Sequence, residues 1–247
     1  MPELKKSLGQ HLLVSEGVLR TLADSLNCEE GDRVVEIGGG TGNLTRVLLE
    51  KPLSRLFVLE VDPDMVRELE RIEDPRLSVV TADATTFPFC SLGEKLRVIG
   101  NLPYNVGSLI VENLVLNRRC IPLGVLMLQK EVALRLTGKG ERGWLSVFLN
   151  TFYTTEYLMS VPPRFFVPRP KVDSGVIRIV RKEKPPQLDD RRFKEFLLRL
   201  FSMKRKMLKK KLPEEVIREA GLDPTLRVEQ IPPEDILRLY NVYEEKR

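Results

Sequence analysis

Short apolar runs alternate along most of the chain with longer stretches whose apolar residues fall at helical spacing. The apolar runs predict buried strands, and the stretches between them predict amphipathic helices. Strands that alternate with helices in this way indicate a parallel, doubly wound sheet. The predicted strands cover residues 33–37, 55–61, 76–81, 96–99 and 124–129, and the predicted helices cover 43–50, 63–72 and 106–116.

The last two predicted strands, 156–161 and 174–180, have no helix between them. A proline-rich segment over 162–173 joins them, so we expect an antiparallel hairpin that completes the sheet. The pattern then stops over 182–190, which has the composition of a linker.

Beyond this linker the chain has a helical pattern again. Residues 191–212 have helical periodicity with a basic polar face, and 214–222 and 232–243 predict two shorter helices. We therefore expect an α/β domain over 1–181 and a small all-α domain over 187–247.

Composition describes an ordinary globular chain, with 247 residues, 42% hydrophobic and 30% charged. It has no apolar stretch as long as a membrane span, and its N-terminus lacks the apolar region of a secretory signal. The chain has three cysteines, Cys28, Cys90 and Cys120, which lie far apart in the sequence. An odd number without close spacing argues against a disulfide framework or a zinc site. We therefore expect a reduced cytoplasmic protein without a metal, whose cysteines are small core residues.

The net charge of +5 is concentrated near the C-terminus. Residues 1–180 hold 22 basic and 22 acidic side chains, whereas 181–247 hold 18 and 13, which accounts for the whole excess. Ten basic residues and one acid, Glu195, fall within 191–211. A local patch of this kind indicates a polyanionic partner.

A glycine-rich loop follows the first predicted strand. Its pattern departs from the dinucleotide fingerprint, because Asn43 stands at the last glycine position, and no lysine follows a glycine as a phosphate-binding P-loop requires. The order acid-x-G-x-G-x-G instead resembles motif one of class I S-adenosylmethionine (SAM)-dependent methyltransferases. Its residues are Glu36, Gly38, Gly40 and Gly42.

Acids end the next two predicted strands. Glu60 stands where a carboxylate commonly accepts hydrogen bonds from both ribose hydroxyls, and Asp83 could accept one from the adenine amine. Either acid alone could be an ordinary solvated residue. Their order after the glycine loop favours a SAM site.

The fourth predicted strand leads into Asn101-Leu102-Pro103-Tyr104. Such residues often form an ordinary surface turn. They could also serve methyl transfer to an exocyclic base amine, whose lone pair is delocalised into the ring. The Asn101 side-chain oxygen and the Leu102 carbonyl, held extended before proline, could accept its two hydrogens, while Tyr104 stacks on a flipped base.

Together these motifs resemble those of the ribosomal small-subunit (16S) rRNA adenine dimethyltransferases, the RsmA/KsgA family. The matching segments are 9–13, 36–45, 59–62, 82–84, 101–105 and 166–174. The resemblance implies a Rossmann-like, seven-stranded, mostly parallel sheet with a small C-terminal all-α domain. One departure is Gly39, where the family usually has proline.

The resemblance also implies roles for individual residues and partners. Phe166 would stack on the target adenine opposite Tyr104. The product would be dimethyladenosine at two adjacent adenosines in a hairpin loop near the 3′ end of 16S rRNA, within the precursor of the small subunit, together with S-adenosylhomocysteine. The implied SAM contacts are His11, Leu13, Gly38, Glu60, Asp83 and Asn101.

A basic segment follows the linker and could be merely a solvated helix face. The positive charges of this segment repel one another, and contact with phosphates would relieve that repulsion. We therefore expect the basic segment to dock rRNA. The segment comprises Lys204, Arg205, Lys206, Lys209, Lys210 and Lys211, and the surface could extend over Lys5, Lys6, Arg118, Arg119, Arg142, Arg164, Arg169 and Lys171.

Two other functions remain open from the sequence. One is a 23S rRNA adenine methylase of the erythromycin-resistance type, which shares the plan but usually carries isoleucine in the tetrapeptide. The other is a non-catalytic RNA-binding factor that retains the fold. We expect a monomer, with no membrane partner.

Overall fold

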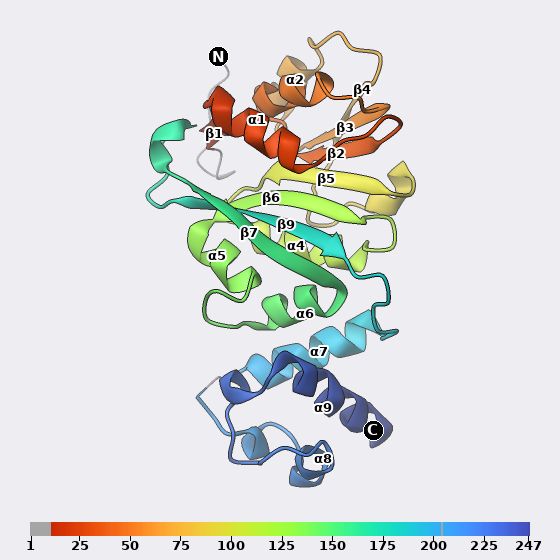
Figure 1. The fold of residues 1–247 in the computed structure, drawn as a ribbon, viewed down its shortest axis with the longest axis vertical. Helices are drawn as coiled ribbons and strands as arrows, with labels where there is room; N and C mark the ends of the chain where they lie inside the picture. The colour runs from red at the N-terminus through yellow and green to blue at the C-terminus, as the bar shows by residue number, and fades with distance from the viewer. Residues whose placement is uncertain (1–10, 204) are drawn as a thin grey trace.

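The computed structural model describes residues 11–203 and 205–247 (Figure 1). Seven strands form one sheet in the order β4-β3-β2-β5-β6-β9-β7. The pairs from β4 to β6 are parallel, whereas β9 is antiparallel to both of its neighbours. The strands are β2 (Arg33–Ile37), β3 (Arg55–Glu60), β4 (Leu77–Thr81), β5 (Leu96–Asn101), β6 (Leu123–Gln129), β7 (Tyr153–Val161) and β9 (Ser174–Arg181).

The predicted strands are confirmed to within a few residues at each end. The expected hairpin is also present, because β7 and β9 pair antiparallel with Val161 opposite Ser174. Its second strand, β9, pairs with β6 and leaves β7 at the sheet edge. A separate two-stranded pair joins β1 (Leu12–Leu13) to β8 (Phe166–Val167).

Five of the predicted helices, 43–50, 63–72, 106–116, 214–222 and 232–243, are present to within a few residues. Asp62 caps its helix by accepting from the Asp64 N–H. The sequence pattern missed three further helices: α1 (Glu16–Ser25), α5 (Lys130–Leu136) and α6 (Trp144–Phe152). No residue of helix α6 is exposed, and its polar residues Ser146, Asn150 and Thr151 are buried or partly buried, so it lacks the wide polar face of a surface helix. The others are α2 (Asn43–Leu49), α3 (Pro63–Leu69), α4 (Gly107–Leu116), α7 (Asp190–Phe201), α8 (Glu214–Glu219) and α9 (Pro233–Glu245).

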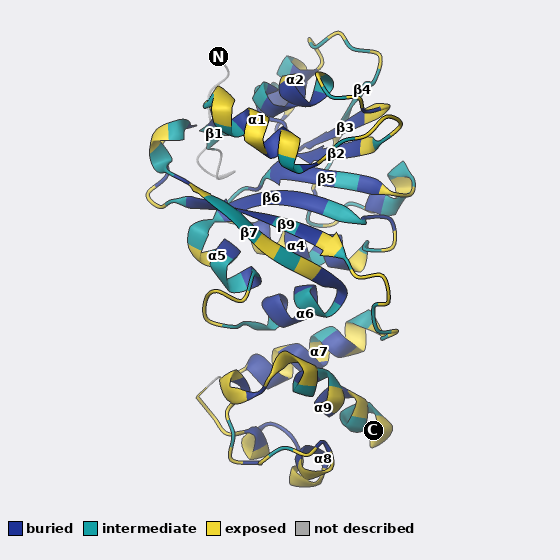
Figure 2. Ribbon diagram, in the orientation of Figure 1, coloured by how far each residue is buried: buried dark blue, intermediate teal, exposed yellow. Residues whose placement is uncertain are grey.

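Alternate residues of the sheet serve two hydrophobic cores. On β2, Val35 and Ile37 belong to the core beneath α4 and α6, while Val34 belongs to the core beneath α1 and α2. This period of two is what a strand buried on both faces requires. Figure 2 shows the dark central strands and the exposed outer faces of the helices.

The C-terminal helices share a core with the sheet domain. Phe193 of α7 packs 6.1 Å from the ring of Phe148 and 6.5 Å from that of Phe152, both on α6. Phe193 also contacts Tyr240 of α9 at 4.8 Å between ring centroids. The helical segment is therefore anchored on α6 and visible as the lower layer of Figure 1.

The basic segment is not one helix, contrary to the prediction. Helix α7 ends at Phe201, and Met203 has a left-handed φ of 51°. Leu208 then donates its N–H to the Leu226 carbonyl, and Met207 forms an isolated bridge with Arg227. These contacts with a later segment replace the hydrogen bonds that would have continued the helix.

The cysteine prediction is wrong for two of the three residues. Cys90 and Cys120 form a disulfide with their Cα atoms 5.5 Å apart, and only Cys28 is a free thiol. Cys90 lies in a short 3-10 helix (Phe89–Leu92) and Cys120 follows α4. The fold thus brings Cys90 and Cys120 together although their spacing in the sequence does not indicate a disulfide.

Loss of this disulfide should destabilise the protein. It closes a segment of 30 residues, for which the chain-entropy account gives about 3–4 kcal/mol. We expect Cys90→Ser, or a reductant added to the wild type, to lower the urea midpoint of unfolding, whereas Cys28→Ser should not. A wild type with three free thiols after unfolding without reductant would contradict the disulfide.

No helix among residues 11–203 and 205–247 is both long and apolar enough to cross a membrane. The same residues contain no group of three or more His, Cys, Asp or Glu side chains placed to hold a metal ion.

Candidate active site

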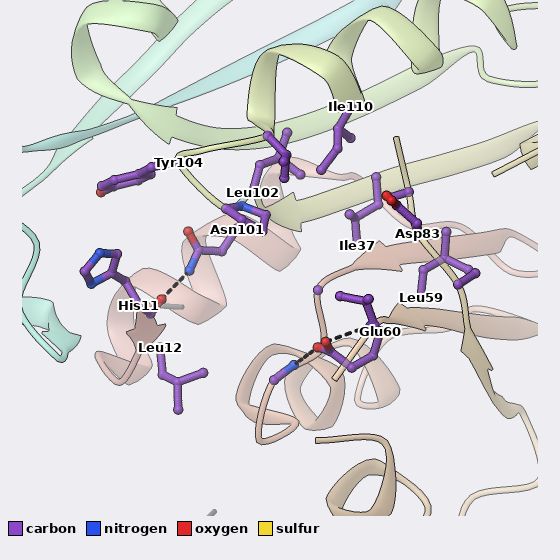
Figure 3. A pocket seen from close by; sticks show the side chains of 17 residues that line it. His11, Leu12, Ile37, Leu59, Glu60, Asp83, Asn101, Leu102, Tyr104 and Ile110 are labelled. Atoms are coloured by element: carbon purple, nitrogen blue, oxygen red, sulfur yellow. Dashed lines mark hydrogen bonds between the residues drawn. The ribbon is translucent and has the colours of Figure 1, made fainter. Parts of the chain in front are cut away.

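A pocket of about 100 Å³ opens at the carboxyl ends of the central parallel strands (Figure 3). In a doubly wound sheet this edge is where ligands bind. Its lining combines polar groups with apolar side chains from the same strand ends. The lining residues are His11, Leu12, Ile37, Gly38, Gly40, Leu59, Glu60, Val61, Ala82, Asp83, Ala84, Asn101, Leu102, Pro103, Tyr104, Val106 and Ile110.

The glycine loop curls over one side of this pocket. Gly38 and Gly40 line it with φ of 74° and 53°, a backbone region that favours glycine. Gly42 does not line the pocket and instead caps α2 with φ of 82°. Gly39 has no room for a side chain, since an added Cβ would lie 2.4 Å from the Val58 Cγ1. The neighbours of Gly39 therefore occupy the space that a proline ring at this position would need.

Glu36 lies beneath the loop rather than in the pocket. Its side chain is buried and accepts a hydrogen bond of 2.7 Å from the Thr45 hydroxyl. Burial raises the pKa of this carboxyl, the Thr45 hydrogen bond lowers it and the nearby Glu60 raises it, so that the resulting pKa is about 8. Glu36 and the predicted cofactor residue Leu13 line a smaller, adjoining cavity.

The two predicted acids of the later strands both reach the pocket. Glu60 accepts the Gly40 N–H at 2.9 Å through one oxygen, which ties the glycine loop to β3. Its other oxygen accepts the N–H groups of Val61 and Asp62, both at 2.9 Å. Asp83 accepts the N–H and hydroxyl of Thr85 through its Oδ1.

Asn101 is held in one orientation at the pocket. Its amide nitrogen donates to the His11 carbonyl at 2.7 Å (Figure 3). Because a carbonyl can only accept, this contact fixes which end of the amide is nitrogen. The Asn101 oxygen therefore lies on the side away from His11, where Figure 3 places it below Tyr104.

Tyr104 forms the rim of the pocket. Its hydroxyl lies 2.6 Å from the Ser174 hydroxyl, and its ring centroid is 5.3 Å from that of His11. His11 in turn donates through Nδ1 to the Pro168 carbonyl at 2.8 Å. Burial raises the pKa of the Tyr104 phenol, so the ring is neutral at physiological pH. The sequence analysis did not identify Ser174 as part of this arrangement.

Phe166 does not lie where the sequence analysis expected it. Its ring is 1% exposed, because β8 pairs with β1 and places Phe166 opposite Leu13. Its neighbour Phe165 is partly exposed, with the Arg164 guanidinium 4.8 Å above its ring. Phe166 is therefore buried in this conformation, and its stacking on the target adenine stays a prediction.

The predicted basic surface is only partly exposed. Lys211 is buried and donates to the Leu200 carbonyl at 2.6 Å, and burial lowers the pKa of its ammonium. Arg118 stacks 3.9 Å over the Phe152 ring and pairs with Asp190 at 2.5 Å, so it joins α4 to α7 instead of facing solvent. Lys5, Lys6 and Lys204 lie outside the described residues. The exposed members are Arg119, Arg164, Arg169, Lys171, Arg205, Lys206, Lys209 and Lys210.

Sequence comparison finds similarity to rRNA methyltransferases along nearly the whole chain. The family model described as "Ribosomal RNA adenine dimethylase" matches residues 1–245. The "Ribosomal RNA small subunit methyltransferase A" of Persephonella marina is 41% identical over 245 residues, 96% of this chain and 92% of the relative. The protein of the same name from Sulfurihydrogenibium sp. is 37% identical over 252 residues, 97% and 96% of the two chains.

Solved structures give the same picture of the fold. A dimethyladenosine transferase from Plasmodium falciparum aligns with a TM-score of 0.82 at 25% identity, over 96% of this chain and 98% of its own. The 23S rRNA methyltransferase ErmE aligns with a TM-score of 0.67, also at 25% identity, over 94% and 99%. These likenesses confirm the predicted class I methyltransferase fold.

Proposed function

Because the chain belongs to the ribosomal RNA adenine dimethylase family, we propose that it dimethylates N6 of two adjacent adenosines in a hairpin loop near the 3′ end of 16S rRNA. The methyl donor is SAM and the setting is the precursor of the small subunit. The observation that carries the proposal is the Asn101 amide, which the His11 carbonyl holds with its oxygen free to face a base amine.

The pocket fits SAM by its chemistry. Glu60 has lone pairs left beyond its backbone contacts with which to accept from ribose hydroxyls. Asp83 keeps its second oxygen for the adenine amine, and the side chains of Ile37 and Ile110 offer apolar surface to the purine. Gly38 and Gly40 let the backbone approach the ligand closely.

When bound, SAM supplies an electrophilic methyl group. The chain's own part is to orient the base: the Asn101 oxygen and the Leu102 carbonyl accept the two amine hydrogens, which turns the nitrogen lone pair out of conjugation. Tyr104, anchored on Ser174, offers its face to the flipped adenine. No residue with a shifted pKa is required, since the methylated amine loses its proton to water. Positioning therefore provides most of the rate gain.

The substrate is tested with isolated ribosomal subunits and labelled SAM. Small subunits that lack the modification should gain label, and mass spectrometry of their rRNA should find dimethyladenosine at two adjacent positions. Large subunits should gain none. Label in 23S rRNA alone would favour the resistance-type activity, for which the ErmE likeness is the supporting observation. Binding without any label would favour a non-catalytic factor.

The exposed basic residues of the helical segment are proposed to dock rRNA. Arg205, Lys206, Lys209 and Lys210 are exposed next to the end of α7. Phosphate contacts there would make RNA affinity fall as salt rises. Arg119, Arg169 and Lys171 extend this proposed surface, whereas the buried Lys211 and the paired Arg118 do not belong to it.

Charge reversal at Lys206, Lys209 and Lys210 should weaken rRNA binding and flatten its salt dependence. Removing one phosphate interaction should reduce the slope of log affinity against log salt by roughly 0.7–0.9. The matched control reverses Arg67 and Arg71 on and next to α3, which are also exposed and basic. Filter binding of a small-subunit rRNA fragment over a salt series measures both quantities. Equal slopes in the two variants would argue against docking at this surface.

A further inference from the structure

A short turn forms one wall of the pocket and follows β4 directly. We call residues 82–87 the wall segment; Ala82, Asp83 and Ala84 from it line the pocket. The segment closes on itself, because the N–H groups of Thr86 and Phe87 donate to the Asp83 carbonyl at 3.2 and 3.0 Å. Its own hydrogen bonds thus shape the turn but do not attach it to the helix behind it.

Asn113 of α4 makes that attachment. Its side chain is 8% exposed, and its amide nitrogen donates to the Ala84 carbonyl and to the Phe87 carbonyl, both at 2.9 Å. Its oxygen accepts from the Asn117 amide at 3.1 Å. Both donor hydrogens of one buried amide are therefore used on two carbonyls of the same turn.

Helix α4 connects this attachment to the catalytic loop. The helix starts directly after the loop of Asn101 and Tyr104, and Ile110, one turn before Asn113, lines the pocket. Without Asn113, the Ala84 carbonyl would be left buried without this partner, and the turn would shift to satisfy it. Asn113 therefore couples the position of Asp83 to that of the tetrapeptide.

We propose that Asn113 is a positioning residue of the methyl-donor site, which fixes the wall segment so that Asp83 and Ala84 are preorganised for the adenine end of SAM. This inference rests on the proposed function. Preorganisation affects the fraction of protein competent to bind, so its loss weakens ligand affinity without changing the chemistry of bound substrate.

The test compares Asn113 with a matched asparagine elsewhere. Asn150 of α6 also donates its amide nitrogen to two backbone carbonyls, those of Leu136 and Ser146, both at 2.7 Å. It lies outside the SAM pocket. We use the Ala and Asp variants at each position, so that the conclusion does not depend on one variant folding.

Calorimetric titration with SAM and with 5′-methylthioadenosine measures the effect, because both ligands carry adenine. Asn113→Ala and Asn113→Asp should bind both about tenfold more weakly. KM for SAM should rise with kcat at saturation unchanged. The Asn150 variants should bind as the wild type does. Affinity of Asn113→Asp should partly recover as pH falls, because a protonated carboxyl can donate one hydrogen.

Unchanged SAM affinity in folded Asn113 variants, or an equal loss of affinity in the Asn150 variants, would overturn the proposed role of Asn113 but leave the proposed function intact. A wild type that binds neither ligand would overturn the proposed function and this inference with it.

Discussion

Asn101→Ala should reduce the rate of methyl transfer by at least about a hundredfold, the typical loss when one preorganised polar group of an active site is removed. The Asn101 oxygen is positioned by the hydrogen bond from its amide to the His11 carbonyl. Without the Asn101 oxygen, one hydrogen of the target amine has no acceptor, and the nitrogen lone pair stays conjugated with the ring. Single-turnover assays with small subunits and saturating SAM measure this step directly.

RNA binding provides the internal control for this variant. The proposed docking residues lie elsewhere on the chain, so Asn101→Ala should retain rRNA affinity and its salt dependence. Asn101→Asp should lose less activity than Asn101→Ala, because a carboxylate still offers an oxygen acceptor although it cannot donate to His11. Turnover of Asn101→Ala at the wild-type rate would refute the proposed mechanism.

Glu36 should make the protein less stable as pH rises. Its folded pKa of about 8 lies above the ordinary value of 4.5. Below pH 4.5 both states are protonated, so the stabilising contribution is fully present. As pH rises from 4.5 to about 8, the Glu36 carboxyl ionises in the unfolded state but not in the folded state. The free energy of unfolding therefore falls by about 5 kcal/mol in total over this window.

Glu36→Gln should remove this contribution, because a glutamine is neutral at every pH and can still accept from Thr45. Urea unfolding of the two proteins across the window isolates the effect, since other titrating groups are common to both. Thr45→Val removes the hydrogen bond that lowers the Glu36 pKa, so the loss of stability should extend to higher pH. Parallel stability curves for the wild type and Glu36→Gln would contradict a raised pKa.

The sheet was predictable because its strands carry their own signal. Buried parallel strands are continuous apolar runs, and β2 occupies the predicted residues 33–37. Helix α6 carries a weaker signal, because it is buried on nearly every side and only Ser146, Asn150 and Thr151 among its residues are polar. In the basic segment the helical periodicity continues beyond the real end of the helix. Helix α7 ends at Phe201, and the chain after it pairs with residues 226 and 227 instead of continuing the helix.

The candidate site divides similarly. Glu60, Asp83 and Asn101 lie at or just after the ends of parallel strands, and such strands bring their carboxyl ends to one edge. The burial of Phe166 could not be predicted, because it depends on pairing with Leu13, which lies far away in the sequence. Asn113 belongs to no motif, and the motif over 166–174 does not indicate that Ser174 contacts Tyr104; each acts through a contact with a distant segment.

The sequence by itself therefore determined the fold class, the family and the polar groups that line the pocket at the strand ends, because strand periodicity and the spacing of motifs are local properties. Only the tertiary structure decided which rings and cations are exposed, that Cys90 joins Cys120, and that Asn113 holds the wall of the pocket. The physical reason is that burial, disulfide geometry and side-chain hydrogen bonds depend on which distant segments pack together, and no local pattern encodes that choice.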